Sequence, residues 1–171
     1  MSDRGLVLNP TRKWDGNKEH EFIISGRSDF DYSKDMQMQK SISGYRVLLE
    51  GAPVMFKSST QKSVALSVCE AEQTAGVLCA QDMLYVWHIL ESMGLKVKLP
   101  RFLEMDNKGA VDLANNWSIG GRTRDVDVQQ CFLQELKESK VIDICWIKGS
   151  ENDVDAFTRN LDAGSAFEKC I

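Results

Sequence analysis

The sequence predicts an α/β domain in which a mixed sheet carries helices on its faces. The chain has 171 residues, enough for one domain with a sizeable core and no disulfide staples. Short strand-like runs are followed by longer runs whose apolar residues recur every three or four positions. Taken in order, the expected elements are β, β, β, α, β, α, α, β and α, without an internal repeat. This order is typical of a layered α/β fold.

The first part of the chain is expected to contain a polar tail and three strands. Residues 1–20 include few apolar side chains and are interpreted as a tail or linker, which leaves 21–171 as the domain. Phe22–Ile24 is a short strand-like run that leads into an acidic cluster. Ser43–Ser59 is expected to form a hairpin, because Glu50-Gly51-Ala52-Pro53 places a turn between two β-rich runs.

The rest of the chain is expected to consist of helices and two further strands. A long helix runs to Met93, where Gly94 is a fitting C-cap. A strand at Arg101–Asp106 is followed by a short helix at Gly109–Asn115 and a helix at Val126–Ser139. Alternating apolar residues then indicate a strand at Val141–Ile147, and a closing helix is expected at Ser150–Asn160.

Composition excludes several classes of protein. The net charge is −4, whereas a nucleic-acid-binding protein usually has a basic surplus, so any contact with phosphates must come from local cations or from metal ions. Five cysteines without a Cys-x-x-Cys pair argue against a zinc site and a disulfide framework. The N-terminus has no signal-peptide core, and no apolar run could span a membrane. We therefore expect an intracellular protein that is not secreted.

Acidic residues stand where two expected strands end. The run from Phe22 leads to Asp29 and Asp31, and the strand before Met105 leads to Asp106. Ligands of open α/β sheets bind outside the carboxyl ends of strands, so acids on neighbouring strands would converge in one cleft. The alternative is that each aspartate caps the turn or helix that follows it.

Two glutamates open the long helix. Ser67-Val68-Cys69-Glu70 fits a capping box, in which Ser67 caps the helix and Glu70 reaches back to the Ser67 amide. Glu72 has no such role and points about 200° away from Glu70 around the helix. It either compensates the helix dipole or projects toward the acids at the sheet edge. Asp155, beside apolar residues of the last helix, is likewise either a boundary residue or a ligand.

Four short blocks contain these acids. They are Ser28-Asp29-Phe30-Asp31, Val68-Cys69-Glu70-Ala71-Glu72, Met105-Asp106-Asn107 and Val154-Asp155-Ala156-Phe157-Thr158-Arg159. In this order and spacing they resemble the ribonuclease H (RNase H) domain at the C-terminal end of copia-type LTR retrotransposon polyproteins. The resemblance runs from about Gly26 to Leu161, which is most of the chain.

The resemblance implies an RNase H-like fold, in which a mixed five-stranded sheet is flanked by helices. It also implies that the protein cleaves the RNA strand of RNA–DNA hybrids. It implies that Asp29, Glu72, Asp106 and Asp155 are the catalytic and metal-binding acids, and so selects Glu72 over Glu70. Four carboxylates in one pocket repel one another unless cations neutralise them. Hard oxygen ligands suit two Mg²⁺ ions, with Mn²⁺ as a possible substitute, in a two-metal mechanism.

The resemblance also implies a location, in a cytoplasmic particle or the nucleus, and partners. The partners are an RNA–DNA hybrid and the reverse transcriptase polymerase domain of the same polyprotein, from which residues 1–20 would lead as a linker. The 2′-hydroxyl distinguishes RNA from DNA, and the expected contacts to the hybrid are Ser28, Asn107, Arg122 and Arg124. The alternative for each is a solvated surface position. Few cationic contacts fit a domain tethered to a polymerase that supplies most of the binding.

One departure and two other functions remain open at this point. Asp125 stands where the family commonly has a histidine, which could slow product handling or disturb a nearby metal or phosphate. A catalytically silent RNase H-like binding or connector module is the first alternative, although four intact acids disfavour it. A DNA-directed nuclease of the same fold is the second, and cleavage of an all-DNA duplex would distinguish it.

Overall fold

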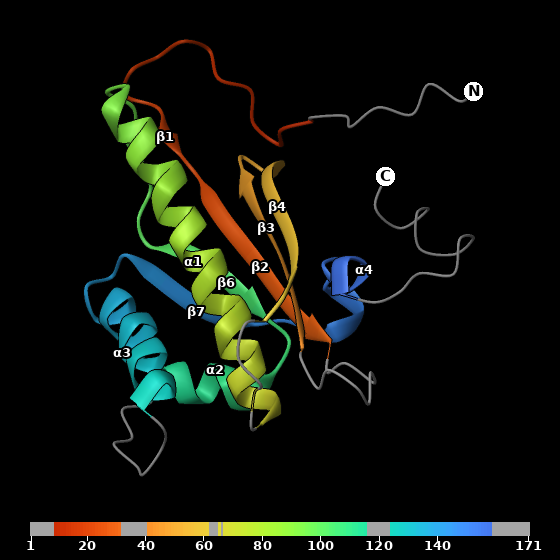
Figure 1. Ribbon diagram of the computed structural model, residues 1–171. Coiled ribbons are helices and arrows are strands. Elements are labelled where there is room, and N and C mark those ends of the chain that lie inside the picture. The colour runs from red at the N-terminus through yellow and green to blue at the C-terminus, as the bar shows by residue number, and fades with distance from the viewer. Residues whose placement is uncertain (1–8, 32–40, 62–64, 66, 116–123, 159–171) are drawn as a thin grey trace, which may run out of the picture.

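A computed structural model describes most of the chain (Figure 1). The described residues are 9–31, 41–61, 65, 67–115 and 124–158. They form one central sheet with helices on both faces, which confirms the predicted α/β class. Among the described helices, none is both long and apolar enough to cross a membrane.

The central sheet is mixed and five-stranded, with the strand order β4-β3-β2-β6-β7. β2 pairs antiparallel with β3, and β3 pairs antiparallel with β4. On the other side, β2 pairs parallel with β6, and β6 pairs parallel with β7. The strands are β2 Ile24–Asp31, β3 Ile42–Leu49, β4 Ala52–Thr60, β6 Arg101–Met105 and β7 Ile142–Trp146. The predicted five-stranded mixed sheet is therefore confirmed.

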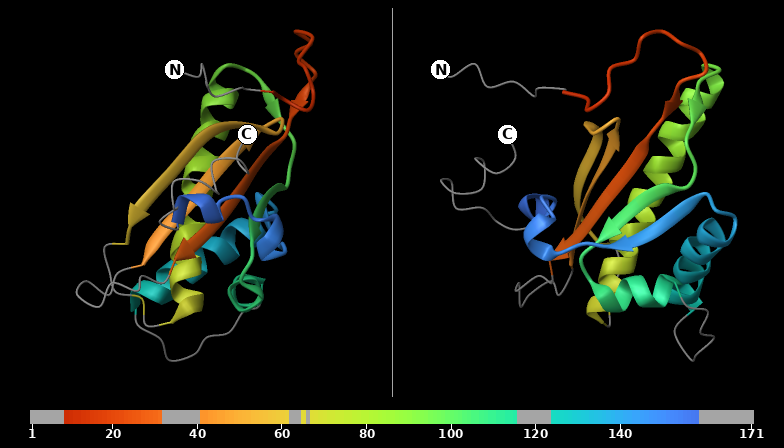
Figure 2. Two further views of the ribbon diagram at one scale, coloured as in Figure 1. Left: turned by 90° about the vertical axis from the view of Figure 1, so that its right-hand side faces the viewer. Right: turned by 180° about the vertical axis from the view of Figure 1, so that it is seen from behind.

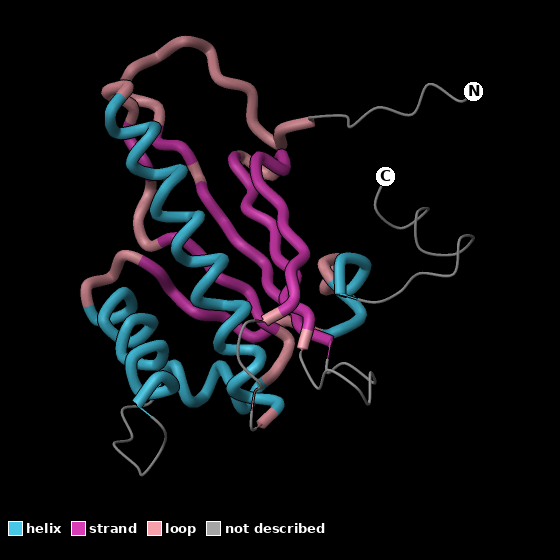
Figure 3. Tube along the Cα trace, in the orientation of Figure 1, coloured by secondary structure: helices cyan, strands magenta, loops and turns pink. Residues whose placement is uncertain are grey.

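Three helices cover one face of this sheet, and a fourth lies on the other (Figures 1 and 2). They are α1 Val68–Ser92, α2 Lys108–Asn115, α3 Arg124–Glu138 and, on the opposite face, α4 Asp155–Thr158. The core fills the space between the sheet and α1–α3, and its buried side chains include Ile24, Tyr45, Val47, Met83, Leu103, Leu133 and Ile144. Apart from the short strands β1 (Glu21–Phe22) and β5 (Lys96–Val97), the distribution of helices and strands along the trace follows the predicted order (Figure 3).

Helix α1 begins and ends as its sequence predicts. Ser67 is the N-cap, and its hydroxyl accepts a hydrogen bond from the Glu70 amide at 3.1 Å. The helix ends at Ser92 with Met93 as its C-cap, and Gly94 follows with a φ of 74°, a conformation that glycine adopts at little cost. The Ser67 half of the predicted capping box is thus confirmed.

Several predicted boundaries differ from the structure. The hairpin turn is only Glu50-Gly51, whose positive φ angles of 51° and 81° suit a tight turn, and Pro53 belongs to β4. The closing segment is not one helix, because a 3₁₀ turn, Gly149–Glu151, is separated from α4 by an extended Asn152. A further parallel pair, β1 (Glu21–Phe22) with β5 (Lys96–Val97), was not predicted.

Residues 9–20 pack against the hairpin turn. Thr11 donates its backbone amide to the Glu50 carbonyl at 2.7 Å, and Arg12 forms an ion pair with the Glu50 carboxylate at 2.8 Å. Glu50 also accepts the Ile23 amide, and the hydrogen bond from Arg12 is the main reason why the pKa of Glu50 is lowered to about 2. The described part of the predicted tail is therefore anchored to the domain, while the domain boundary itself stays a prediction.

Candidate active site

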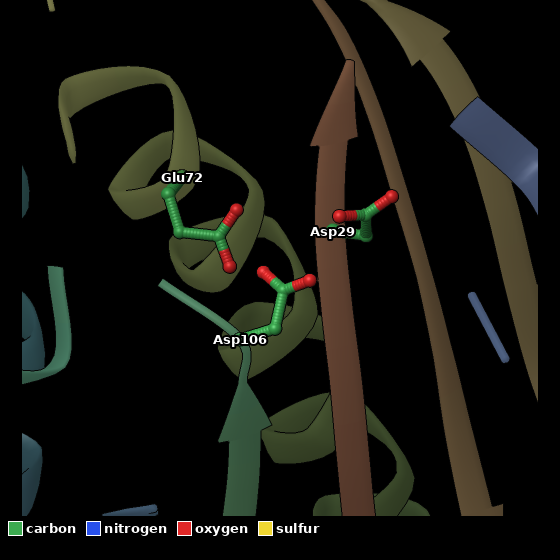
Figure 4. A group of neighbouring side chains, drawn as sticks. All are labelled: Asp29, Glu72 and Asp106. Carbon is green, nitrogen blue, oxygen red and sulfur yellow. The ribbon is translucent and has the colours of Figure 1, made fainter. Parts of the chain in front are cut away.

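Three of the four predicted acids converge at one end of the sheet (Figure 4). Asp29 lies in β2, Asp106 directly follows β6, and Glu72 lies near the start of α1. One carboxylate oxygen from each lies within 4.8 Å of the others. Figure 4 shows the three side chains pointing toward one another from three separate elements.

The pairing of the strands explains why the two aspartates meet. Ser28 of β2 is in register with Met105 of β6, so the residues that follow them lie side by side. The strand ends at Asp31, the second of the two aspartates predicted at its end, so Asp29 lies within β2, which pairs with β3 over its whole length. The functional consequence is unchanged, since Asp29 lies beside the end of β6.

A glycine brings α1 close enough to β6 for the glutamate to join the aspartates. A Cβ atom on Gly76 would lie only 3.2 Å from Cε of Met105, so the helix touches this strand directly. Glu72 lies four residues earlier, one turn nearer the helix start, and is fully buried. The packing of α1 therefore positions Glu72, and the structure brings Glu72 rather than Glu70 into the cluster.

The Glu72 carboxylate is buried with little compensation from the described residues. Neither oxygen accepts a hydrogen bond of ordinary geometry from them. Burial, followed by the negative charges of Asp106 and Asp29, raises the pKa of Glu72 well above 4.5, and the nearby Asp106 backbone offsets this only in part. A buried carboxylate without partners is costly, so this position favours a bound cation.

Asp29 has a similar environment with one difference. Burial, together with the charges of Asp106 and Asp155, raises the pKa of Asp29 to about 6. The hydroxyl of Thr158 opposes this shift, because it donates a hydrogen bond to Oδ2 of Asp29 at 2.5 Å. The hydrogen bond engages one carboxylate oxygen from the side of α4.

Asp155 lies beside this cluster without being part of it. It is the first residue of α4, is half-buried, and is close enough for its charge to act on Asp29. It does not belong to the group of acids within 4.8 Å of one another. The acids come from both faces of the sheet, with Glu72 on the α1 side and Asp155 on the α4 side.

The residues present fit a hard divalent cation. All the donors are carboxylate oxygens, which is the ligand type that Mg²⁺ and Mn²⁺ prefer in proteins. Two of the three acids are buried, and neither oxygen of Glu72 accepts a hydrogen bond of ordinary geometry from the described residues, so both could ligate a cation. A cation would also remove the mutual repulsion that raises the pKa values of Asp29 and Glu72.

The predicted nucleic-acid contacts have different outcomes. Ser28 is fully buried, and it faces α1 because it lies two residues from Gly26 in β2 and shares its face, where a Cβ on Gly26 would abut Met83. Its hydroxyl is therefore not accessible to a substrate in this structure. The side-chain oxygen of Asn107 accepts the Ala110 amide at 3.0 Å and so caps α2.

The two arginines named with them are not positioned by the structure. Arg122 lies outside the described residues. Arg124 begins α3, but its side chain is also outside the described part. Both stay predictions.

Sequence reasoning did not identify the groups that attach the Asp155 segment to the sheet. Thr158 donates a hydrogen bond to Asp29, and Asn152 donates one to the Ser28 carbonyl. Asp153 forms ion pairs with two arginines of the sheet. Asn152, Asp153 and Thr158 flank Asp155 closely in sequence, which was the only signal that could have found them. Their partners on the sheet come from distant strands and could not be inferred.

Transposon Pol polyproteins contain a segment that is similar to this chain. The retrovirus-related Pol polyprotein from transposon TNT 1-94 of Nicotiana tabacum is 30% identical over 148 residues, which are 86% of this chain and 11% of that protein. The Pol polyprotein from transposon RE2 of Arabidopsis thaliana is 25% identical over 159 residues, 93% of this chain and 10% of that protein. No protein-family model matches the chain.

Solved structures with a similar fold are RNases H. LC11-RNase H1, isolated from compost, superimposes with a TM-score of 0.55 at 14% identity, over 79% of this chain and 91% of that one. RNase H1 from Halobacterium salinarum superimposes with a TM-score of 0.53 at 14% identity, over 85% of this chain and 98% of that one. LC11-RNase H1 in complex with an RNA/DNA hybrid superimposes with a TM-score of 0.52 at 11% identity, over 75% of this chain and 88% of that one.

The chain is homologous to transposon Pol polyproteins and has the RNase H fold. The predicted resemblance and the predicted RNase H-like fold are both confirmed. This RNase H-fold chain spans about a tenth of the length of the Pol polyproteins that it matches. The activities of those larger proteins are therefore not transferred to it by the similarity.

Proposed function

We propose that this chain is a metal-dependent endoribonuclease that cleaves the RNA strand of RNA–DNA hybrids during retrotransposon reverse transcription. The observation that carries the proposal is the convergence of Asp29, Glu72 and Asp106, with the buried Glu72 carboxylate lacking a hydrogen-bond partner among the described residues. A structural role alone does not account for an uncompensated buried carboxylate beside two other acids.

The proposed cofactor is Mg²⁺, as two ions, with Mn²⁺ as a substitute. Asp29, Glu72 and Asp106 would hold it together with Asp155, whose charge already acts on Asp29. When bound, such ions supply an activated water and stabilise the oxygen that leaves. Among the described residues, neither histidine lies in the cluster: His20 contacts Glu50 and His88 lies near the end of α1 beside Glu91. The carboxylates, by holding the ions, are therefore the groups proposed to support catalysis, and neither histidine takes part.

The proposed substrate is supported by one structural neighbour, which was solved with an RNA/DNA hybrid. Asn107 follows Asp106 and uses its side-chain oxygen to cap α2, which leaves its amide nitrogen to donate to a hydroxyl or a phosphate. Arg122 and Arg124 are the proposed phosphate contacts. Ser28 is left out of the proposed contact surface because it is buried.

The proposed partner in the cell is the reverse transcriptase polymerase domain of the same polyprotein. The homologous Pol polyproteins are about ten times longer than the matched segment, so they contain other domains before or after it. A net charge of −4 fits a domain whose affinity for nucleic acid comes mostly from such a neighbour.

Cleavage of an end-labelled RNA–DNA hybrid in Mg²⁺ tests the proposal. Wild-type protein should cut the RNA strand, Glu72→Gln should lose cutting by at least about a hundredfold, and Glu70→Gln should keep it. Glu70→Gln is a matched control, since it makes the same change two residues away at the same helix start. Cutting of an all-DNA duplex at a similar rate would instead favour a DNA-directed nuclease. Absence of cutting in both Mg²⁺ and Mn²⁺ would favour a catalytically silent module.

A further inference from the structure

The segment that carries Asp155 has little regular structure of its own. It consists of the 3₁₀ turn Gly149–Glu151, an extended Asn152, a turn at residues 153–154 and the one-turn helix Asp155–Thr158. So short a helix is not stable by itself, because nucleation is unfavourable and few internal bonds form. Contacts with the sheet must therefore hold this segment in place.

Asp153 supplies the charged contacts. One of its carboxylate oxygens pairs with Arg27 of β2 at 3.4 Å, and the other pairs with Arg46 of β3. Arg27 also donates to Glu104 of β6 at 2.5 Å and to the Glu151 carbonyl at 3.2 Å. The side chains of Arg27, Arg46, Asp153 and Glu104 are all only 22–28% exposed, so they form a partly buried network across three adjacent strands.

Uncharged side chains on either side of Asp153 also attach this segment to the sheet. The side-chain amide of the buried Asn152 donates to the Ser28 carbonyl at 3.0 Å, and its oxygen accepts the Val154 amide at 3.3 Å. Val154 is fully buried. The Thr158 hydroxyl, also buried, contacts both Oδ2 of Asp29 and the Asp155 carbonyl.

The network and the candidate cation site share one rigid strand. Arg27 and Asp29 are two residues apart in β2 and therefore project from the same face of the sheet. Arg27 is in register with Arg46 on one side and with Glu104 on the other. Any displacement of Asp153 from the two arginines would move Asp155 and Thr158 relative to Asp29.

We propose that Asp153 is a positioning residue for the cation site. By pairing with Arg27 and Arg46 it holds the 149–158 segment on the sheet, so that Thr158 orients the Asp29 carboxylate and Asp155 lies beside it. This inference rests on the proposed function, since it assumes that the acids bind a divalent cation. It assigns a role to a network that lies on the face of the sheet opposite α1.

A purely structural role for Asp153 makes a different prediction from a positioning role. If the network only stabilises the fold, its loss lowers the unfolding temperature and leaves cation affinity in the folded protein unchanged. If it positions the site, cation affinity falls while the protein remains folded. Groups that orient metal ligands from outside typically change metal affinity by about 10–100-fold when they are mutated.

Titration of Mn²⁺ into the full chain, followed by electron paramagnetic resonance of the free ion, tests the inference without an activity assay. Asp153→Asn should weaken Mn²⁺ binding at least about tenfold at a temperature where circular dichroism shows a folded protein. Asp143→Asn is the matched control, because Asp143 is on the same sheet face in β7 and has no ion pair with the described residues. Asp153→Glu, which keeps the charge, should recover part of the affinity.

Cleavage kinetics supply a second readout. The Mg²⁺ concentration for half-maximal cleavage should rise about tenfold in Asp153→Asn, whereas the rate at saturating Mg²⁺ should change much less. If Asp153→Asn does not fold, Arg46→Lys serves instead, since it keeps the charge but loses the planar fork that reaches Asp153. Wild-type Mn²⁺ affinity in a folded variant would overturn the positioning role alone. Absence of Mn²⁺ binding by the wild type would overturn the proposed function as well.

Discussion

The hydroxyl of Thr158 donates a hydrogen bond to Oδ2 of Asp29 across a sequence separation of 129 residues. The contact joins the last described helix to the second strand of the chain, and it lies on the face of the sheet opposite Glu72. It lowers a pKa that burial and two neighbouring acids raise. Thr158 therefore keeps Asp29 closer to the charged form that a cation requires.

Replacing Thr158 with valine should raise the pKa of Asp29 above about 6 in metal-free protein. Valine has nearly the same shape but cannot donate a hydrogen bond, so the charged carboxylate loses a stabilising contact. Carbon-13 NMR titration of the aspartate carboxyls measures the shift directly. Thr60→Val, at the exposed end of β4, is the control and should leave the Asp29 titration unchanged.

Metal-free protein should be less stable at about pH 7.5 than at about pH 5. The pKa of Asp29 is raised from 3.8 to about 6, and that of Glu72 is raised well above 4.5, so both groups bind protons more tightly in the folded state. Their contribution to stability is complete below their unfolded pKa values and is lost as the pH rises through the folded ones. Thermal unfolding in a chelator at the two pH values measures the difference.

Two additions sharpen the pH experiment. Glu72→Gln removes one of the titrating groups, so the variant should lose less stability than the wild type between the two pH values. Mg²⁺ should raise the unfolding temperature of the wild type at the higher pH and should do so less in Glu72→Gln. A wild-type protein whose stability is independent of pH in this range would contradict the raised pKa values.

Gly26→Ala should destabilise the fold by about 1–3 kcal/mol, because the new methyl group would overpack the contact between β2 and α1. A Cβ atom on Gly26 would lie 2.5 Å from Sδ of Met83 and 2.6 Å from Sγ of Cys79. Urea denaturation measures the loss. Ser25→Ala, at the preceding position on the other face of the strand, should cost much less, and equal losses would contradict the close approach of the helix.

Arg12→Met should loosen the N-terminal segment without affecting the core. Arg12 pairs with Glu50, which also accepts the Ile23 amide at 2.9 Å. Without the arginine, the carboxylate loses its main cationic partner, and amide hydrogen exchange at Thr11 and Ile23 should accelerate. Exchange at Val47, fully buried in β3, is the internal reference. Unchanged exchange at Ile23 would mean that the segment is held by its backbone contacts alone.

Local signals predicted most of the fold. The Ser67 cap, Gly94 and the three-and-four spacing define α1, and alternating apolar residues define β7. Boundaries were less accurate where tertiary pairing extends an element, as in β2, which continues through Asp29 because β3 pairs with it. The closing helix was overestimated because the extended Asn152, bonded to the Ser28 carbonyl, interrupts it.

The sequence by itself predicted the order of the main elements, because caps and periodicity act over a few residues. Its resemblance to RNase H domains predicted the four acids and selected Glu72 over Glu70. Only the tertiary structure decided which acids meet, since Asp29, Glu72 and Asp106 come from elements joined by strand register and by the close packing of Gly76 on Met105. It also decided that Ser28 is buried and that Asp153 pairs with Arg27 and Arg46. Contacts between distant strands depend on how the whole chain packs, and no short stretch of sequence contains that information.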